Sequence, residues 1–259
     1  FAASVPAFAQ QLIDTFWPGA LTLILPRRPG VAEAAAGGHA TIGLRCPAHP
    51  VAHALLAAAA ARGVRGLAAP SANRFGRISP TTAQHVAQEF GDELLVLDGG
   101  ACSVGIESTI VDCTRGAPVL LRPGQIARAD IERVAGQRLL SKDELSTPDP
   151  QAPGTLLAHY APRARLRLMN DKELRAALEL LGADAKNIAV WARAPLRSAS
   201  RALVLRRMPD DAAAAAQQLF AVLRGFDDAG VALIWVETPP DDAAWDGVRD
   251  RLQRAAASA

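Results

Sequence analysis

The stretch GLAAPSAN, residues 66–73, joins a short predicted strand at 66–69 to a loop of small and hydroxyl-bearing residues. Ser79 and Pro80 follow, and we predict that they are the N-cap and first position of a helix running to about Phe90. Backbone N–H groups in such a loop can approach a phosphate or a carboxylate closely, because small side chains do not shield them. A plain turn stabilised by Ser71 and Asn73 also accounts for these residues, and the stretch taken alone favours the turn.

Short strands and few helices surround this loop in the first part of the chain. The apolar stripe of Phe8, Leu12 and Phe16 predicts a helix over 6–16, and an alanine-rich run predicts another over 50–62. Further strands are predicted at 21–25, 41–45, 94–97, 108–112 and 118–121. This mixture predicts an α+β domain built on a mixed sheet.

The second part of the chain has a different organisation. Residues 141–162 show no periodicity and contain four prolines, which predicts a linker. Beyond it, strands predicted at 165–168, 187–191, 202–205 and 232–236 alternate with helices at 171–181, 210–228 and 243–256. Such alternation is typical of a small parallel α/β domain. The predicted domains are therefore 1–140 and 163–259, joined by the linker 141–162.

Composition excludes several classes of protein. The 259 residues carry a formal net charge of +2, with 21% charged and 50% hydrophobic residues, which excludes disordered, collagen-like and disulfide-scaffold chains. The three cysteines lack C-x-x-C spacing and the histidines lack metal-ligand spacing, so we expect no metal held by protein ligands and a reducing, cytoplasmic location. No apolar run reaches about 18 residues and no basic segment opens the chain, so neither a transmembrane helix nor a signal peptide is predicted.

Several polar residues are candidates for ligand binding. Alternation along 41–45 puts Thr41 and Arg45 on one face of a strand, where the arginine could clamp a carboxylate or phosphate; a salt bridge at a sheet edge is the alternative. Ser108 and Arg122 each lie close to a glycine, a pattern that ordinary hairpins also produce. Tyr160 lies in the proline-rich linker, which could dock in a groove or cover a ligand.

Taken together, a series of segments resembles one family, the YrdC-type threonylcarbamoyl-AMP synthases. They match in order and spacing over residues 1 to about 135: FWPGALT (16–22), RCPAHP (45–50), APSAN (69–73), SPT (79–81), DGG (98–100), GIEST (105–109) and LRPG (121–124). APG (152–154), HYAP (159–162) and the C-terminal part resemble the two-domain members. The resemblance implies an α/β protein, with an α+β YrdC-like mixed-sheet domain and a small, parallel, Rossmann-like C-terminal domain.

The resemblance also implies a reaction and its site. Members of this family join L-threonine, bicarbonate or CO2, and ATP into threonylcarbamoyl-AMP and pyrophosphate, for threonylcarbamoyladenosine modification of tRNA. Mg²⁺ would be carried by the phosphates, and tRNA or a downstream threonylcarbamoyl transferase would be a partner. No residue is assigned as a general acid or base. The implied threonine-binding residues are Arg45, Ala69 (through its backbone) and Ser108, and the implied ATP-binding residues are Thr41, Ser71, Asn73, Ser79, Arg122 and Tyr160.

The chain departs from the family pattern upstream. The family's K-x-R motif precedes the FWPG segment, but no lysine occurs here before Lys142 and the first residue is Phe1. We therefore expect a start further upstream, and a chain that as given is poorly soluble or at least about a hundredfold slower than its parent. The alternatives are an RNA-binding YrdC-like module without catalysis, an inactive fragment, and a carbamoyltransferase of hydrogenase maturation, against which the scattered cysteines argue.

Overall fold

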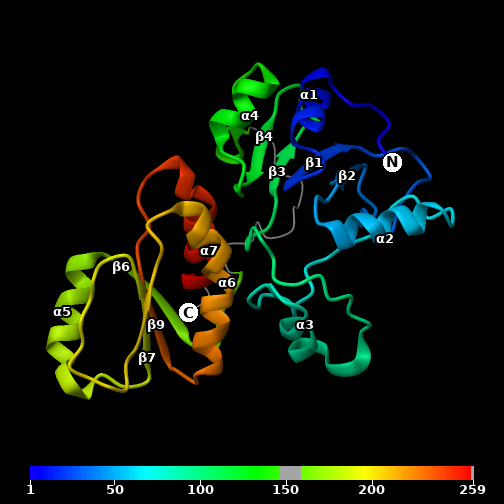
Figure 1. Ribbon diagram of the computed structural model, residues 1–259. Helices are drawn as coiled ribbons and strands as arrows, with labels where there is room; N and C mark the ends of the chain where they lie inside the picture. The colour runs from blue at the N-terminus through cyan, green and yellow to red at the C-terminus, as the bar shows by residue number, and fades with distance from the viewer. Residues whose placement is uncertain (146–158, 258–259) are drawn as a thin grey trace. The chain divides into compact units, whose positions relative to one another are not determined.

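The computed structural model describes residues 1–145 and 159–257, which form two compact units (Figure 1). The described residues of the first unit are 1–70 and 107–145, and those of the second are 71–106 and 159–257. Residues 71–106 thus group with the C-terminal part of the chain. The predicted division into 1–140, 141–162 and 163–259 stays a prediction. Most of the predicted linker, including the APG segment at 152–154, lies outside the described residues.

The first unit is built on a five-stranded mixed sheet with the strand order β2-β1-β3-β4-β5. Its strands are β1 (Leu21–Pro26), β2 (Thr41–Leu44), β3 (Thr109–Asp112), β4 (Val119–Arg122) and β5 (Leu140–Ser141). β1 pairs antiparallel with β2 and parallel with β3, while β4 pairs antiparallel with β3 and parallel with β5. The predicted mixed sheet is confirmed.

Two helices pack on one face of this sheet. In α1 (Ala7–Phe16) the buried residues are Phe8, Ala9 and Leu12, and they join the strand residues of β1 in one core cluster. α4 (Arg128–Ala135) adds Ile131 to the same cluster. α2 (Pro50–Ala60) buries no residue, and the short 3₁₀ helix η2 spans Lys142–Glu144. The other face of the sheet carries a smaller apolar cluster, leaving room there for polar side chains.

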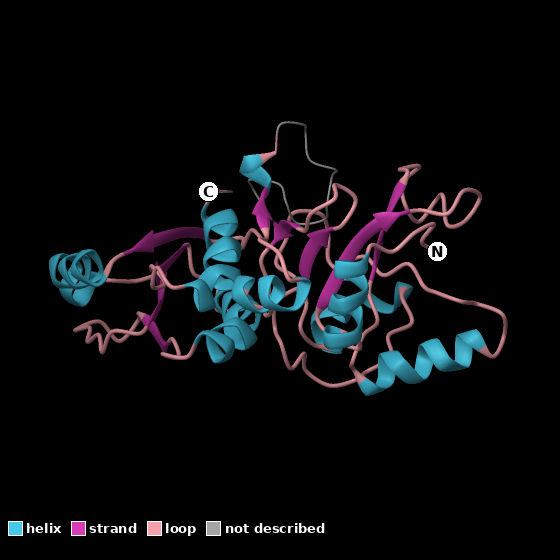
Figure 2. Cartoon of the chain, turned by 90° about the horizontal axis from the view of Figure 1, so that it is seen from above, coloured by secondary structure: helices cyan, strands magenta, loops and turns pink. Residues whose placement is uncertain are grey.

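The C-terminal part of the second unit is the predicted parallel α/β fold. Its sheet has the order β6-β9-β7-β8, formed by β6 (Arg165–Met169), β7 (Ile188–Ala192), β8 (Val204–Arg207) and β9 (Leu233–Glu237). α5 (Asp171–Leu181) covers one face, and α6 (Ala212–Asp228) with α7 (Asp246–Ala256) covers the other (Figures 1 and 2). The 3₁₀ helices η3 (Gly182–Asp184) and η4 (Ala243–Trp245) complete it.

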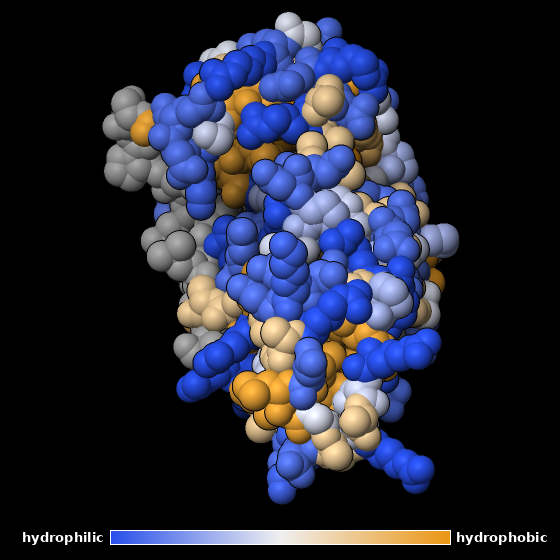
Figure 3. All heavy atoms as spheres, turned by 90° about the vertical axis from the view of Figure 1, so that its left-hand side faces the viewer, coloured by the Kyte–Doolittle hydropathy of each residue, from blue (hydrophilic) through white to orange (hydrophobic). Residues whose placement is uncertain are grey.

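The face turned to the viewer in Figure 3 carries mostly hydrophilic side chains, with smaller apolar patches among them. Most large apolar residues of the C-terminal α/β fold instead lie in two internal clusters, one on each side of its sheet. Within the part of the chain that the structure describes, no helix is long and apolar enough to cross a membrane.

Residues 66–106 differ from prediction at three places. The helix is α3 (Ala83–Phe90), and η1 (Gly91–Glu93) follows it. The predicted start at Ser79 is wrong: Thr82 is the N-cap, because its hydroxyl accepts the His85 backbone N–H at 3.2 Å. The predicted strands at 66–69 and 94–97 are also wrong. Neither finds a neighbouring strand among the described residues, and Leu95 is 89% exposed.

Candidate active site

Ser108 is the centre of a polar cluster in the first unit. Its hydroxyl lies 2.7 Å from the Thr22 hydroxyl, and the Arg122 guanidinium donates to it at 3.3 Å. Arg122 also donates to the Ser108 carbonyl oxygen from Nε at 3.1 Å and from Nη2 at 3.0 Å. Ser108 and Arg122 are both buried. A guanidinium group held in this way places a permanent positive charge beside two hydroxyl groups.

Strand register explains why these residues meet. Thr22 in β1 pairs with Ile110 in β3, and Ile110 pairs with Arg122 in β4. The register of β3 against β4 shifts beside Ile110, because Val111 pairs with Leu120, so one residue of β4 is left over between the two pairs. Such a bulge redirects the side chains next to it. It sets Arg122 on the face of the sheet that holds Ser108.

Gly124 allows the LRPG and GIEST segments to pack closely. A Cβ atom at this position would lie 2.5 Å from the Thr109 nitrogen and 2.9 Å from the Glu107 carbonyl oxygen. Because both are backbone atoms, a side chain could enter only by displacing the loop that carries Ser108. Close approach of backbone is one of the reasons for glycine next to a site.

Arg45 lies directly after β2, one residue beyond the pairing of Leu44 with Leu23. That position is next in register to Thr22, so Arg45 and the Ser108 cluster belong to the same end of the sheet. Arg45 is exposed, and it makes no ion pair with any residue in the ranges 1–145 and 159–257. The predicted alternative, a salt bridge at the sheet edge, is therefore not formed among these residues. Thr41 begins β2, opposite Pro26.

The other predicted residues lie outside this cluster. Ala69 is exposed in an irregular loop of the first unit, and Ser71 is exposed at the start of the second. Ser79 is buried in the second unit, where its carbonyl oxygen accepts from Arg224 Nε at 3.3 Å. The structure thus brings Ser108 and Arg122 together in one unit, while Ser71, Asn73, Ser79 and Tyr160 belong to the other.

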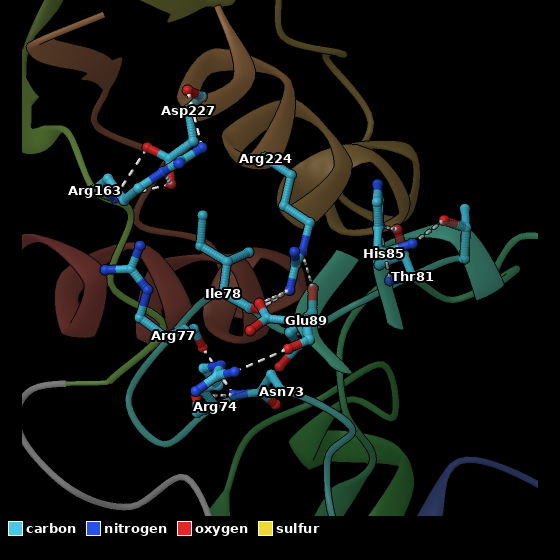
Figure 4. Close-up of polar contacts among 12 residues, drawn as sticks. Asn73, Arg74, Arg77, Ile78, Thr81, His85, Glu89, Arg163, Arg224 and Asp227 are labelled. Atoms are coloured by element: carbon cyan, nitrogen blue, oxygen red, sulfur yellow. Dashed lines mark hydrogen bonds and ion pairs between the residues drawn. The ribbon is translucent and has the colours of Figure 1, made fainter. Parts of the chain in front are cut away.

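Asn73 organises the loop that follows it. Its Nδ2 donates to the carbonyl oxygens of Arg74 at 2.9 Å and Arg77 at 3.1 Å (Figure 4). Its Oδ1 is buried and has no hydrogen-bond partner among the described residues. Since both donors are occupied, the side chain can offer a ligand only this acceptor, which suits a hydroxyl group or the water shell of a metal ion better than a phosphate oxygen.

Tyr160 is part of the apolar core of the second unit. It is 1% exposed, its ring centroid lies 5.3 Å from that of Phe220, and the Arg251 guanidinium lies 5.6 Å above it. Directly after it, the Ala161 N–H donates to the Gly76 carbonyl oxygen at 2.8 Å. The end of the linker is thereby fixed to the loop that Asn73 organises.

Replacing Tyr160 with alanine should lower the free energy of unfolding of the second unit by about 3–5 kcal/mol, the usual cost of deleting a buried aromatic ring. Tyr160→Phe keeps the ring and should lose only the smaller contribution of the hydroxyl group, about 1 kcal/mol. Urea unfolding of both variants, followed by tryptophan fluorescence, measures the difference. An alanine variant as stable as the parent would contradict the packing described for this ring.

His85 gives α3 a pH-dependent contact. The Thr81 N–H donates to His85 Nδ1 at 3.2 Å, so this nitrogen must be unprotonated. Burial, and after it the charge of Arg224, lowers the pKa of His85 below the usual 6.5, with Asp228 partly opposing the shift. As the pH falls through 6.5, the unfolded chain takes up the proton before the folded chain does. The folded state therefore loses stability on acidification.

We expect the midpoint temperature of thermal unfolding to decrease as the pH is lowered from about 8 to about 5.5. The decrease should be smaller in His85→Gln, whose side chain does not titrate in this range. Thermal unfolding of both proteins at each pH measures the two slopes. Equal slopes would show that His85 does not contribute to the acid sensitivity.

Two residues of these clusters were not singled out from the sequence. Thr22 lies in the FWPGALT segment, but only the register of β1 against β3 reveals that it reaches Ser108. Arg224 is buried in α6 on a face whose other buried residues are alanine or large apolar residues, and a lone arginine on such a face was an available signal. It forms an ion pair with Glu89 at 2.9 Å.

Neither cysteine chemistry nor protein-held metal is apparent at these positions. Among the described residues, no group of three or more His, Cys, Asp or Glu side chains is placed to hold a metal ion. Cys113 is buried beside Asp112, and burial together with that charge raises the pKa of its thiol to about 12. A thiol of such high pKa is a poor nucleophile near neutral pH.

Fold and site together define an α/β protein that gathers guanidinium and hydroxyl groups at one end of a mixed sheet, and comparisons with known proteins identify its family. Residues 1–124 match the family described as telomere recombination, and residues 126–257 match the C-terminal domain of threonylcarbamoyl-AMP synthase. The threonylcarbamoyl-AMP synthase of Pyrococcus abyssi is 35% identical over 98% of this chain and 75% of its own length. That of Bacillus subtilis is 34% identical, over 97% of this chain and 73% of its own.

A solved structure extends the match to three dimensions. The crystal structure of P. abyssi Sua5 in complex with L-threonine superposes with a TM-score of 0.85 at 34% identity, covering 99% of this chain and 76% of that one. The chain belongs to the threonylcarbamoyl-AMP synthase family, and the predicted family, fold class and two-domain form are confirmed.

Proposed function

We propose that this protein is an L-threonylcarbamoyladenylate synthase, a nucleotidyltransferase that converts L-threonine, bicarbonate or CO2, and ATP into threonylcarbamoyl-AMP and pyrophosphate. The observation that carries the proposal is the cluster at the end of the mixed sheet. There the Ser108 hydroxyl lies 2.7 Å from the Thr22 hydroxyl and accepts a hydrogen bond from the buried Arg122 guanidinium. Arg45 is next in register to Thr22 and forms no ion pair within the described ranges. Family membership supports the reaction assigned to this cluster.

The threonine part of the site uses charge and hydroxyl contacts. We assign Arg45 to the threonine carboxylate, because an exposed guanidinium without an ion pair among the described residues can form a bidentate contact. Ser108 is assigned to the polar groups of the amino acid, and the Ala69 backbone completes the pocket. The crystal structure of P. abyssi Sua5 is a complex with L-threonine, which supports the choice of this amino acid.

The ATP part uses Thr41, Ser71, Asn73, Ser79, Arg122 and Tyr160. Arg122 supplies positive charge for the phosphates, and the buried, unpartnered Oδ1 of Asn73 fits a ribose hydroxyl or a water of Mg²⁺ carried by the nucleotide. In the reaction the neutral amine of threonine first adds CO2 and gives up one N–H proton to solvent, which leaves a carbamate. A carbamate oxygen then bonds to the α-phosphorus, and the bond from that phosphorus to the pyrophosphate oxygen breaks.

Positioning and electrostatic stabilisation carry this chemistry, since no side chain is assigned as a general acid or base. Two anionic reactants must be held in contact, and the negative charge on the leaving pyrophosphate must be neutralised. Threonylcarbamoyl-AMP donates the threonylcarbamoyl group that forms threonylcarbamoyladenosine in tRNA. The proposed downstream partner is therefore tRNA or the transferase that uses this product.

The function is tested by pyrophosphate release. Purified protein with ATP, Mg²⁺ and bicarbonate should release pyrophosphate only when L-threonine is added, and the product should co-migrate with threonylcarbamoyl-AMP on reversed-phase chromatography. Omission of bicarbonate is the matched control. Threonine-independent release, or binding of RNA without any turnover of ATP, would contradict the proposal and favour the RNA-binding alternative.

A further inference from the structure

The second unit contains a polar hollow that the proposed reaction does not use. Its volume is about 380 Å³, and four arginines line it together with Glu89 and two aspartates of α6 (Figure 4). The arginines come from three segments far apart in sequence: Arg74 and Arg77 from the loop before α3, Arg163 from the chain before β6, and Arg224 from α6.

Each of the three carboxylates is already engaged by an arginine. Glu89 is paired with Arg224 at 2.9 Å. Asp227 accepts the backbone N–H of Arg163 at 2.8 Å and lies 3.8 Å from the guanidinium of the same residue. Asp228 lies 3.6 Å from that guanidinium. Arg163 and Arg224 therefore engage all three carboxylates, but their two positive charges leave one of the three negative charges to be balanced by the other arginines.

The other two arginines of the hollow are Arg74 and Arg77. Neither makes an ion pair with a residue in the described ranges, and Arg77 is partly buried. The Arg74 guanidinium donates only weakly, at 3.3 Å, to the Glu89 carbonyl oxygen. A partly desolvated cation without a counter-charge is costly, and an anion in the hollow would remove that cost.

The loop that carries these two arginines is held in place before any ligand arrives. Asn73 Nδ2 bridges the carbonyl oxygens of Arg74 and Arg77, and Ala161 donates to the Gly76 carbonyl oxygen at 2.8 Å. Because the backbone is fixed at both ends of the loop, binding would require ordering only of the arginine side chains.

We propose that this hollow binds a small, multiply charged phosphate anion. Paired guanidinium groups suit phosphate oxygens, and the four arginines outnumber the three carboxylates of the hollow, which therefore carries a net positive charge. The lining residues include no aromatic side chain on which a base could stack. Asp227 and Asp228 border the hollow and would repel the extended polyanion of a nucleic acid, while a compact anion can sit against Arg74 and Arg77.

The test is a titration of the protein with inorganic phosphate, measured by isothermal titration calorimetry at low ionic strength and without threonine or ATP. Arg77→Gln should weaken binding at least about tenfold. The matched control is Arg62→Gln, which removes an exposed arginine just after α2 whose guanidinium donates to the Ala58 carbonyl oxygen. This control should bind phosphate as the parent does.

A second variant guards against loss of binding through misfolding. Asp228→Asn removes one of the carboxylates that Arg163 balances, so phosphate should bind up to about fivefold tighter. Equal affinity of the parent, Arg77→Gln and Asp228→Asn would overturn the proposal. It would also be overturned if a single-stranded RNA oligonucleotide bound in an Arg77-dependent manner while phosphate did not bind. Since no substrate of the proposed reaction is present, failure here leaves the synthase activity untouched.

Discussion

L-Threonine should be preferred over L-valine by about 10⁴ in kcat/KM for pyrophosphate release. The two amino acids have nearly the same shape and differ in one hydroxyl group. Ser108, Thr22 and Arg122 form a buried polar cluster at the proposed threonine site, and valine would leave polar groups of that cluster facing a methyl group. Unpaired buried polar groups are far more costly than a missing methyl group.

L-Serine separates the contribution of the threonine hydroxyl group from that of the threonine methyl group, because serine keeps the hydroxyl and lacks the methyl group. Loss of a methyl contact should cost about 10- to 200-fold, so serine should lie between threonine and valine. The measurement is kcat/KM for each amino acid at saturating ATP and bicarbonate. If valine were used as well as serine, the Ser108 cluster would not be reading the hydroxyl group.

Arg122→Met should reduce kcat/KM by at least about a hundredfold. The guanidinium makes two hydrogen bonds to the Ser108 carbonyl oxygen and one to its hydroxyl, and methionine has a similar length but no donor. Its removal frees the loop that positions Ser108 and also removes the charge assigned to the ATP phosphates. Because both effects act on the same step, kcat/KM should fall further than it does when an exposed charge is removed.

Two further variants make this result interpretable. Arg122→Lys keeps the charge but cannot reproduce donation from two nitrogens of a planar group, so it should recover only part of the activity. Arg133→Met removes an arginine whose side chain is 68% exposed and should be neutral. Full activity of Arg122→Lys would mean that charge alone matters, and full activity of Arg122→Met would remove Arg122 from the site.

Secondary structure in the C-terminal part was predictable because local signals are strong there. The predicted helix at 171–181 matches α5 residue for residue, since Asn170 and Glu173 form a capping box at its start and Gly182 follows its end. The helix after ISPTT was placed too early, at Ser79. Several hydroxyl residues in succession can serve as N-cap, and the structure distinguishes them because the Thr82 hydroxyl accepts the His85 N–H.

The candidate site divides in the same way. Motif order identified Arg45, Ser108 and Arg122 as members of one family pattern, and the alternation of 41–45 indicated that Thr41 and Arg45 share a face. The sequence could not show that Thr22 contacts Ser108, because that contact depends on the register of two strands separated by more than eighty residues. Nor could it show that Tyr160 is buried against Phe220 and Arg251.

The sequence by itself determined the family, the two kinds of sheet and most helices, because these follow from motif spacing and from apolar periods of two and 3.6 residues that operate within a short stretch of chain. Only the tertiary structure decided which charges are balanced. Among the described residues, Arg224 and Arg163 pair with carboxylates on other elements while Arg74 and Arg77 form no ion pair, and this distinction comes from distances between segments that no local pattern encodes. Likewise, the runs at 66–69 and 94–97 are apolar enough for strands, yet a strand exists only where a neighbour completes its hydrogen bonds.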